Sequence, residues 1–150
     1  MAVRVLCMLC PATIAGALML SSLPVRADQA LIDYRHAVME SIGGHTSALA
    51  AIVKGQVPYT QDAAVHARAI EPLAKISSHI FPPDSQTGKT EALPAIWEQP
   101  EKFQKALAAF ETAAADLAKA ADSSPRELAA PLSGLVKACK GCHDDFRKKD

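Results

Sequence analysis

Residues 124–147 read SPRELAAPLSGLVKACKGCHDDFR, and this stretch predicts both a helix and the site that the helix carries. Apolar residues recur at intervals of three and four, the spacing of one face of an α-helix. That face consists of Leu128, Leu132, Leu135, Cys139, Cys142 and Phe146. Ser124 and Glu127 have the spacing of a capping box, and Pro125 suits the first helical position. Pro131 departs from the pattern and predicts a kink or a later start of the helix.

Two thiols three positions apart, followed at once by a histidine, lie near the end of this helix: Cys139, Cys142 and His143. This is the pattern of covalent c-type haem attachment. Because a helix returns to one face after three or four residues, the three side chains reach the same side. A structural zinc site would need four ligands, and a thioredoxin-like redox pair is expected beside a βαβ pattern. The sequence shows neither context, so it predicts one covalent haem c, with iron, on the last helix.

Residues 1–27 have the pattern of a secretory signal peptide. Arg4 supplies a positive charge before an apolar stretch that reaches Leu20, and Val25-Arg26-Ala27 places small residues where a signal peptidase reads. The apolar stretch is short for a membrane-spanning helix, which favours cleavage after Ala27 over a retained anchor. The expected mature protein is exported to the periplasm and has no stable membrane insertion.

Cleavage would leave residues 28–150 as one domain, long enough for a single core. Because residues 1–27 contain two arginines and no acids, the remaining chain has 14 basic and 16 acidic side chains, a net charge near −2. This charge, without a long basic run, argues against nucleic-acid binding. Only Cys139 and Cys142 of the four cysteines would remain. Two free thiols in an oxidising compartment tend to form a disulfide, and thioether bonds to haem would prevent this.

The chain predicts four helical segments and no convincing strand. The first runs from about 29 to 53 and the second from about 60 to 80, with Pro72 expected to bend or break it. A long connection follows to about residue 99, and the third helix begins near Pro100. Together with the last helix, these segments predict an all-α fold: an antiparallel four-helix bundle with haem c attached near the C-terminus of the last helix.

Three further segments, with the motif at 139–147, resemble the class II c-type cytochromes, the family of cytochrome c′ and its low-spin, methionine-ligated relatives. The segments are YRHAVM at 34–39, VKGQVPY at 53–59, and PAIW at 94–97 followed by Phe103. The similarity extends from about residue 31 to residue 149. It implies that Cys139 and Cys142 form the thioethers and that His143 is the proximal ligand of the iron.

The same resemblance implies weaker contacts around the haem. Arg35 matches an arginine near a haem propionate, which charge pairing favours, and His36 matches a polar residue that contacts the haem. Arg147 would lie beside the proximal face, and Thr87 in the long loop would approach a propionate. Arg35 and Arg147 are alternatively ordinary surface charges.

Met39 is expected at the second axial position of the iron. It follows Arg35 by four residues, so both lie on one helical face. The resemblance implies two alternatives: a methionine that binds the iron, raises its potential and suits electron transfer, or a residue that only covers an open, five-coordinate iron. A methionine on an apolar face can also simply pack in a core. His45, His66 and His79 are rival ligands or exposed residues.

The resulting prediction is an exported cytochrome that transfers electrons by Fe(III)/Fe(II) cycling, an electron-transfer protein and not an enzyme. Its redox partner proteins are not indicated by the sequence. The alternative is a five-coordinate cytochrome c′ that binds nitric oxide or carbon monoxide in a gas-binding or protective role. A non-haem structural or metal-binding bundle is the third hypothesis. The resemblance also implies a homodimer.

Overall fold

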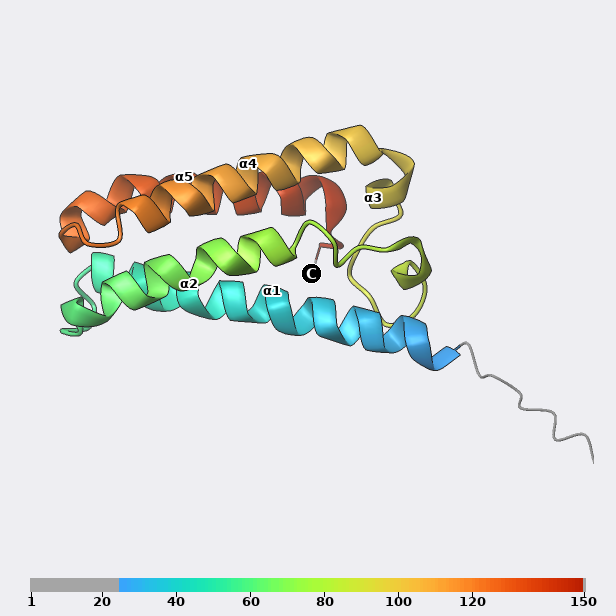
Figure 1. The fold of residues 1–150 in the computed structure, drawn as a ribbon, viewed down its shortest axis with the longest axis horizontal. Coiled ribbons are helices and arrows are strands. Elements are labelled where there is room, and N and C mark those ends of the chain that lie inside the picture. Colours follow the sequence, from blue (N-terminus) through green and yellow to red (C-terminus); the bar gives the residue numbers. More distant parts are fainter. Residues whose placement is uncertain (1–24, 150) are drawn as a thin grey trace, which may run out of the picture.

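A computed structural model describes residues 25–149 of the chain as a bundle of four long helices (Figure 1). The long helices are α1 (Val25–Val53), α2 (Ala63–Ile76), α4 (Pro100–Lys119) and α5 (Pro125–Phe146). Three short helices lie in the connections: η1 (Thr60–Asp62), η2 (Pro83–Ser85) and α3 (Ala95–Glu98). Within the described residues the only extended pairing is a single antiparallel bridge between Ala92 and Arg147. The predicted all-α four-helix bundle is therefore confirmed.

The predicted signal peptide lies largely outside the described residues, which begin with the first turn of α1 at Val25. Cleavage after Ala27 consequently stays a prediction. Among residues 25–149, no helix combines the length and the apolar character needed to cross a membrane.

Helix α1 ends in a turn that the sequence dictates. Gly55 adopts a positive φ of 67°, a conformation that glycine reaches without steric cost. The Gly55 N–H donates to the Ile52 carbonyl and the Gln56 N–H donates to the Ala51 carbonyl, both at 2.9 Å. This pair of bonds is a Schellman motif, which satisfies the last carbonyls of the helix and reverses the chain toward α2.

Helix α5 begins at the predicted capping box. The Ser124 Oγ accepts a hydrogen bond from the Glu127 N–H, and a Glu127 carboxylate oxygen accepts one from the Ser124 N–H at 2.9 Å. The helix starts at Pro125 and continues through Pro131, so the later start suggested by Pro131 is wrong. Likewise, α2 continues through Pro72 to Ile76, and the break expected there is not observed.

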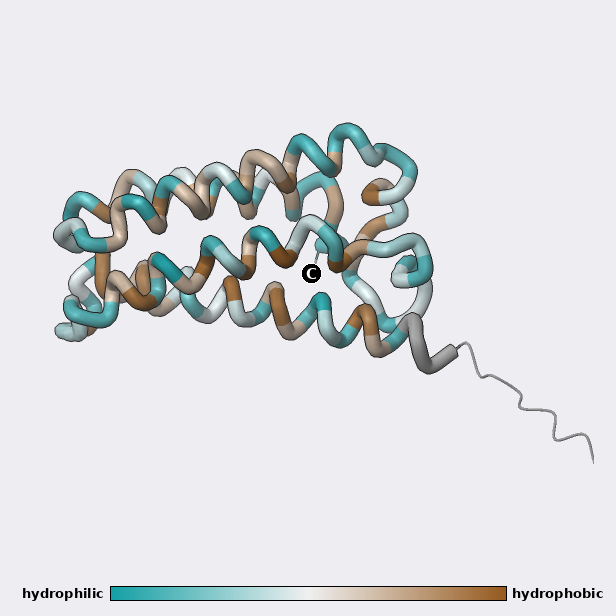
Figure 2. Tube along the Cα trace, in the orientation of Figure 1, coloured by the Kyte–Doolittle hydropathy of each residue, from teal (hydrophilic) through white to brown (hydrophobic). Residues whose placement is uncertain are grey.

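The interior of the bundle consists of two clusters of buried side chains. The larger cluster joins all four long helices and contains the fully buried Leu49, Ile70, Leu117 and Leu128. The smaller cluster contains Ile96, Phe103, Leu107 and Phe146 and lies near α3 and the end of α5. Figure 2 shows hydrophobic residues recurring between hydrophilic ones along each long helix, as the periodicity predicts.

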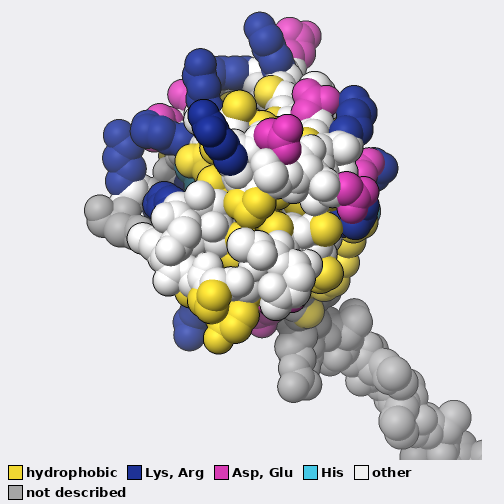
Figure 3. Space-filling view, turned by 90° about the vertical axis from the view of Figure 1, so that its left-hand side faces the viewer, with side chains coloured by type: hydrophobic (Ala, Val, Ile, Leu, Met, Phe, Trp, Pro, Cys, Tyr) yellow, Lys and Arg dark blue, Asp and Glu magenta, His cyan; other side chains and the backbone are white. Residues whose placement is uncertain are grey.

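The two ends of the bundle are built differently. At one end, short turns join α1 to α2 and α4 to α5 (Figure 1). Figure 3 looks at this end, where hydrophobic side chains show between the charged ones. At the other end, a long connection from α2 to α4 runs past the C-terminal end of α5 (Figure 1). The predicted site lies toward that second end.

Candidate functional site

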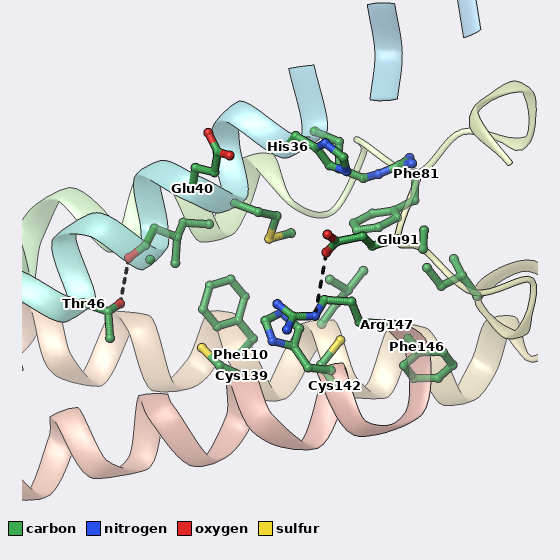
Figure 4. Close-up of a pocket in the computed structure, with 18 of the residues that line it drawn as sticks. His36, Glu40, Thr46, Phe81, Glu91, Phe110, Cys139, Cys142, Phe146 and Arg147 are labelled. Atoms are coloured by element: carbon green, nitrogen blue, oxygen red, sulfur yellow. Dashed lines mark hydrogen bonds and ion pairs between the residues drawn. The ribbon is translucent and has the colours of Figure 1, made fainter. Parts of the chain in front are cut away.

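A cavity of about 470 Å³ opens between α1, α4, α5 and the connection that precedes α4 (Figure 4). Its volume is in the range of pockets that bind small molecules and cofactors. Most of its wall is apolar, and the contributing side chains include Ile42, Ile96, Phe103, Leu107, Phe110 and Phe146. Cys139 and Met39 pack against the larger core cluster and Cys142 packs against the smaller one, so the cavity lies between the two clusters.

The α5 wall brings together the residues of the predicted attachment motif. Cys139, Cys142 and His143 all line the cavity, which agrees with the expectation that they share one side of the helix. Both cysteines are free thiols. Figure 4 shows them on the α5 side, with Phe110 nearby.

Burial controls the protonation of these three groups. It raises the pKa of both thiols, and the neighbouring Cys139 and Asp145 contribute further to a Cys142 pKa of about 11. His143 keeps an exposed edge, and partial desolvation and the positive charge of Arg147 lower its pKa. At neutral pH the structure therefore favours protonated thiols and a neutral imidazole, the form of histidine that binds metal ions.

Helix α1 supplies the opposite wall. Arg35, His36 and Met39 line the cavity together with Ile42, which confirms that they share one face of the helix. Met39 is partly buried. The structure thus places Met39 and His143 at one cavity, on two different helices.

Arg35 is buried, with only 2% of its surface exposed. Its Nη1 donates to the Ser85 hydroxyl at 2.6 Å and to the Ile80 carbonyl at 3.3 Å. Its Nη2 donates to the Thr90 hydroxyl at 2.9 Å and to the Ser85 carbonyl at 3.2 Å. The guanidinium carbon also lies 5.0 Å from the centre of the Phe81 ring. The alternative that Arg35 is an ordinary surface charge is therefore wrong.

No carboxylate of the described residues forms an ion pair with Arg35. Burial lowers its pKa, yet a guanidinium stays charged at neutral pH. The site therefore contains a buried positive charge whose partners on the described chain are all neutral oxygens and a ring.

Arg147 lies at the rim of the cavity. Its side chain is 42% exposed, and its Nε lies 4.0 Å from a carboxylate oxygen of Glu91 (Figure 4). Arg147 lines the cavity, as expected for a residue beside the proximal face of the haem. Its charge is also partly exposed, as expected for an ordinary surface arginine, so the structure is compatible with both expectations.

Thr87 is exposed and does not line the cavity. The buried polar residues of the same loop are Ser85 and Thr90, which the sequence analysis did not single out. Their sequence context offers only a weak signal, because hydroxyl residues in a loop are ordinarily solvated. The one signal for them is Arg35 itself, because an arginine that is buried needs polar partners, which a neighbouring loop can supply.

None of the three other candidate histidines lines the cavity. His45 and His66 face each other across α1 and α2, with their Nδ1 atoms 3.0 Å apart. His79 is exposed near the end of α2. Met39 is thus the remaining candidate for the second axial position among those that the sequence offered.

The residues of this cavity fit a covalently attached haem. One wall offers two thiols and an imidazole, the opposite wall offers a thioether, and the remaining surface is mainly aromatic and aliphatic. The buried Arg35 is suited to an anionic group, since buried charges in proteins are normally paired. Fold and site together define a four-helix bundle with a c-type haem attachment motif on its last helix.

Comparison with known proteins agrees with this class. The model of the family described as Cytochrome C' matches residues 30–147. The chain belongs to the cytochrome c′ family, whose members bind haem c, with its iron, covalently.

Individual relatives support the assignment over most of the chain. A cytochrome c′ of Rhodopseudomonas palustris is 38% identical over 142 residues, which cover 92% of this chain and 95% of the relative. The structure of cytochrome c prime from Shewanella frigidimarina has a TM-score of 0.76 and 33% identity, and the match covers 81% of this chain and 97% of that one. A nitric oxide complex of a mutant of cytochrome c prime from Alcaligenes xylosoxidans matches with a TM-score of 0.74 and 27% identity, over 81% and 97% of the two chains.

Proposed function

We propose that this protein is a periplasmic electron carrier that uses Fe(III)/Fe(II) cycling of one haem c and catalyses no reaction of its own. The observation that carries the proposal is the presence of Met39 and His143 at one cavity, on two different helices. When bound, a haem with one histidine and one thioether ligand supplies reversible one-electron chemistry at a raised potential. The residues of the chain hold the group and control access to it.

Cys139 and Cys142 are the proposed attachment residues. Burial raises the pKa of both thiols above the ordinary value, so they are protonated at neutral pH before attachment. Thioether bonds from these two residues would hold the haem. His143 is the proposed proximal ligand, and its lowered pKa maintains the neutral imidazole needed for this role.

Arg35 is the proposed partner of a haem propionate. Four hydrogen bonds occupy its two terminal nitrogens, which leaves the Nε–H as the donor for a further acceptor. A carboxylate would also neutralise the buried charge, whose isolation is otherwise costly. His36 and Arg147, at the edge of the same cavity, complete the proposed haem environment. Thr87 lies outside the cavity, and we assign it no part in the site.

Met39 is the proposed second axial ligand. Its partial burial and its place in the cavity wall support this assignment, and the competing histidines at positions 45, 66 and 79 do not reach the cavity. A filled axial position suits electron transfer, because small neutral gases then compete poorly for the iron.

A gas-binding role is the second candidate function. It is favoured by the nitric oxide complex known for a variant of the Alcaligenes xylosoxidans relative. In that case Met39 would only cover the iron. The homodimer implied by the resemblance is independent of this choice and remains a prediction.

Visible spectra of the ferrous holoprotein, with and without carbon monoxide, separate the two functions. We expect a low-spin spectrum that carbon monoxide leaves unchanged. Met39→Leu retains most of the side-chain volume but removes the sulfur, so it should give a high-spin protein that binds carbon monoxide. Met39→Ala should behave in the same way. A high-spin wild-type spectrum that changes at once with carbon monoxide would contradict Met39 ligation and favour the gas-binding role over electron transfer.

A further inference from the structure

The connection between α2 and α4 contacts both walls of the cavity. We define the bridging loop as residues 80–93. Thr90 lies in its second half and is only 8% exposed. The Thr90 hydroxyl accepts hydrogen bonds from the Arg35 Nη2 at 2.9 Å and from the Ala92 N–H at 3.1 Å. The Thr90 carbonyl accepts one from the Lys148 Nζ at 2.8 Å. A single residue therefore bonds to α1 and to the segment that follows α5.

On the α5 side, the bridging loop pairs with the residues that follow the attachment motif. The Leu93 N–H donates to the Phe146 carbonyl at 2.9 Å, and the Lys148 N–H donates to the Glu91 carbonyl at 2.8 Å. These bonds flank the antiparallel bridge between Ala92 and Arg147. The paired segment begins three residues after His143, so it is joined directly to the helical turn that carries the proposed proximal ligand.

On the α1 side, the bridging loop holds Arg35, which precedes Met39 by one helical turn. Ile80, Ser85 and Thr90 all accept hydrogen bonds from its guanidinium. Because an α-helix is rigid over one turn, fixing Arg35 also fixes the backbone of Met39. The loop thus connects the wall that carries Met39 to the wall that carries His143.

We propose that Thr90 is a positioning residue that sets the separation of these two walls, and with it the strength of the Met39 ligation. The inference depends on the proposed function, since it concerns the second axial ligand. Replacing the hydroxyl by a methyl group would leave donors of Arg35 and Ala92 without their acceptor, and a lost partner of a buried donor is expensive. The α1 wall would then move more freely relative to α5.

The test uses three variants of the holoprotein. Thr90→Val preserves the shape of the side chain and removes its acceptor, Thr90→Ser retains the hydroxyl, and Thr87→Val makes the same change at the exposed threonine of the same loop. The measurement is the rate of carbon monoxide binding to the ferrous protein, together with amide hydrogen exchange at Leu93 and Lys148. We expect carbon monoxide to bind to Thr90→Val, with faster exchange at both amides, because the α1 wall is then less firmly held. The other two variants should resemble the wild type, whose spectrum carbon monoxide leaves unchanged.

The outcomes separate this inference from the proposed function. The wild-type spectrum alone decides whether Met39 is a ligand, whatever Thr90 does. If the wild type is five-coordinate, Met39 ligation fails, but a positioning role still requires a changed carbon monoxide rate in Thr90→Val. If Thr90→Val showed faster amide exchange but unchanged carbon monoxide binding, Thr90 would stabilise only the loop, and the proposed positioning role would be wrong. An equal effect of Thr87→Val, or no effect of Thr90→Val on either measurement, would overturn the proposal.

Discussion

The bundle has a filled end, defined here as the end with the larger core cluster, and a cavity end. The same helices form both ends. At the filled end the inward positions of α5 are leucines, among them the fully buried Leu128 and Leu135. About one, two and three turns after Leu135, the same face presents Cys139, Cys142 and then Phe146. The comparison shows that helical periodicity determines which positions face inward, whereas residue identity determines whether they fill space or bind a cofactor.

The cavity end is supported by aromatic side chains where the filled end uses aliphatic ones. Phe103 contacts Phe81 and Phe146 edge to face, with ring centres 4.9 and 5.1 Å apart. The Trp97 indole N–H donates to the Phe81 carbonyl at 3.1 Å. Rigid rings in defined pairs line a cavity without collapsing into it. The long connection, which supplies Phe81 and Trp97, is thus part of the structure of the site.

The largest expected effect comes from removing the attachment residues of the cavity end. In Cys139→Ala/Cys142→Ala the chain has no thiol for a vinyl group, so a pyridine haemochrome assay should detect no covalent haem. Lys140→Ala, which changes an exposed residue between the two cysteines, should retain it. A c-type spectrum from the double variant would contradict the assigned role of both thiols.

A leucine deletion at the filled end should reduce stability without altering the haem spectrum. Leu128 is fully buried, and Leu→Ala substitutions in well-packed cores lower the free energy of unfolding by about 2–5 kcal/mol. Denaturant unfolding of the holoprotein measures this loss, and the visible spectrum serves as the second readout.

Leu107→Ala is the matched substitution at the cavity end. Leu107 is 4% exposed and lines the cavity, so its loss should change the haem spectrum. The distinction between the two ends would fail if Leu128→Ala altered the spectrum as strongly as Leu107→Ala.

A smaller effect is expected from the capping box at the start of α5. Ser124→Ala removes the side-chain acceptor, which costs about 1 kcal/mol at neutral pH. Hydrogen bonds from Ser124 lower the pKa of Glu127 below its ordinary value of 4.5. Because the pKa is lower in the folded state, ionised Glu127 stabilises the fold at pH values above the ordinary pKa. This stabilisation is lost as the pH falls through the pKa of the folded state.

Thermal unfolding as a function of pH checks this prediction. The difference in Tm between wild type and Ser124→Ala should shrink as the pH falls below 4.5, the ordinary pKa of the carboxyl group. Ser123→Ala, at the adjacent exposed serine, should match the wild type throughout. A difference that stays constant with pH would show that Glu127 does not contribute.

The helices and the inward faces could be predicted from the sequence because both depend on local periodicity. The residues at 139, 142 and 143 were predicted from the haem-attachment pattern, and Arg35 and Met39 from the resemblance to class II cytochromes. Periodicity predicted that each set shares one helical face, and the structure brings both sets to one cavity. The start of α5 at Ser124 and Pro125 was predicted correctly from the capping box, and only the later start considered because of Pro131 was wrong. Within an otherwise strong helical face, packing offsets the cost of one missing N–H.

The loop contacts could not be predicted in this way. Arg35 bonds to residues 45, 50 and 55 positions away, and no periodic pattern indicates such pairs. The resemblance suggested Thr87, whereas the structure buries Thr90 and Ser85 instead. Short helix α3, within a segment predicted only as a long connection, contacts α4 and also α5, which is distant from that connection in sequence.

The contrast between the capping box and the bridging loop also has a kinetic meaning. The capping box joins residues three positions apart, whereas the bond from Lys148 to Thr90 closes 58 positions of chain. Local helical turns form within microseconds, and contacts that close long loops form later because chain entropy opposes them. The last helix can therefore become helical, with Cys139 and Cys142 on one face, before the bridging loop docks against residues 146–148. In this order of events both thiols are presented to the cofactor while the cavity end is still open.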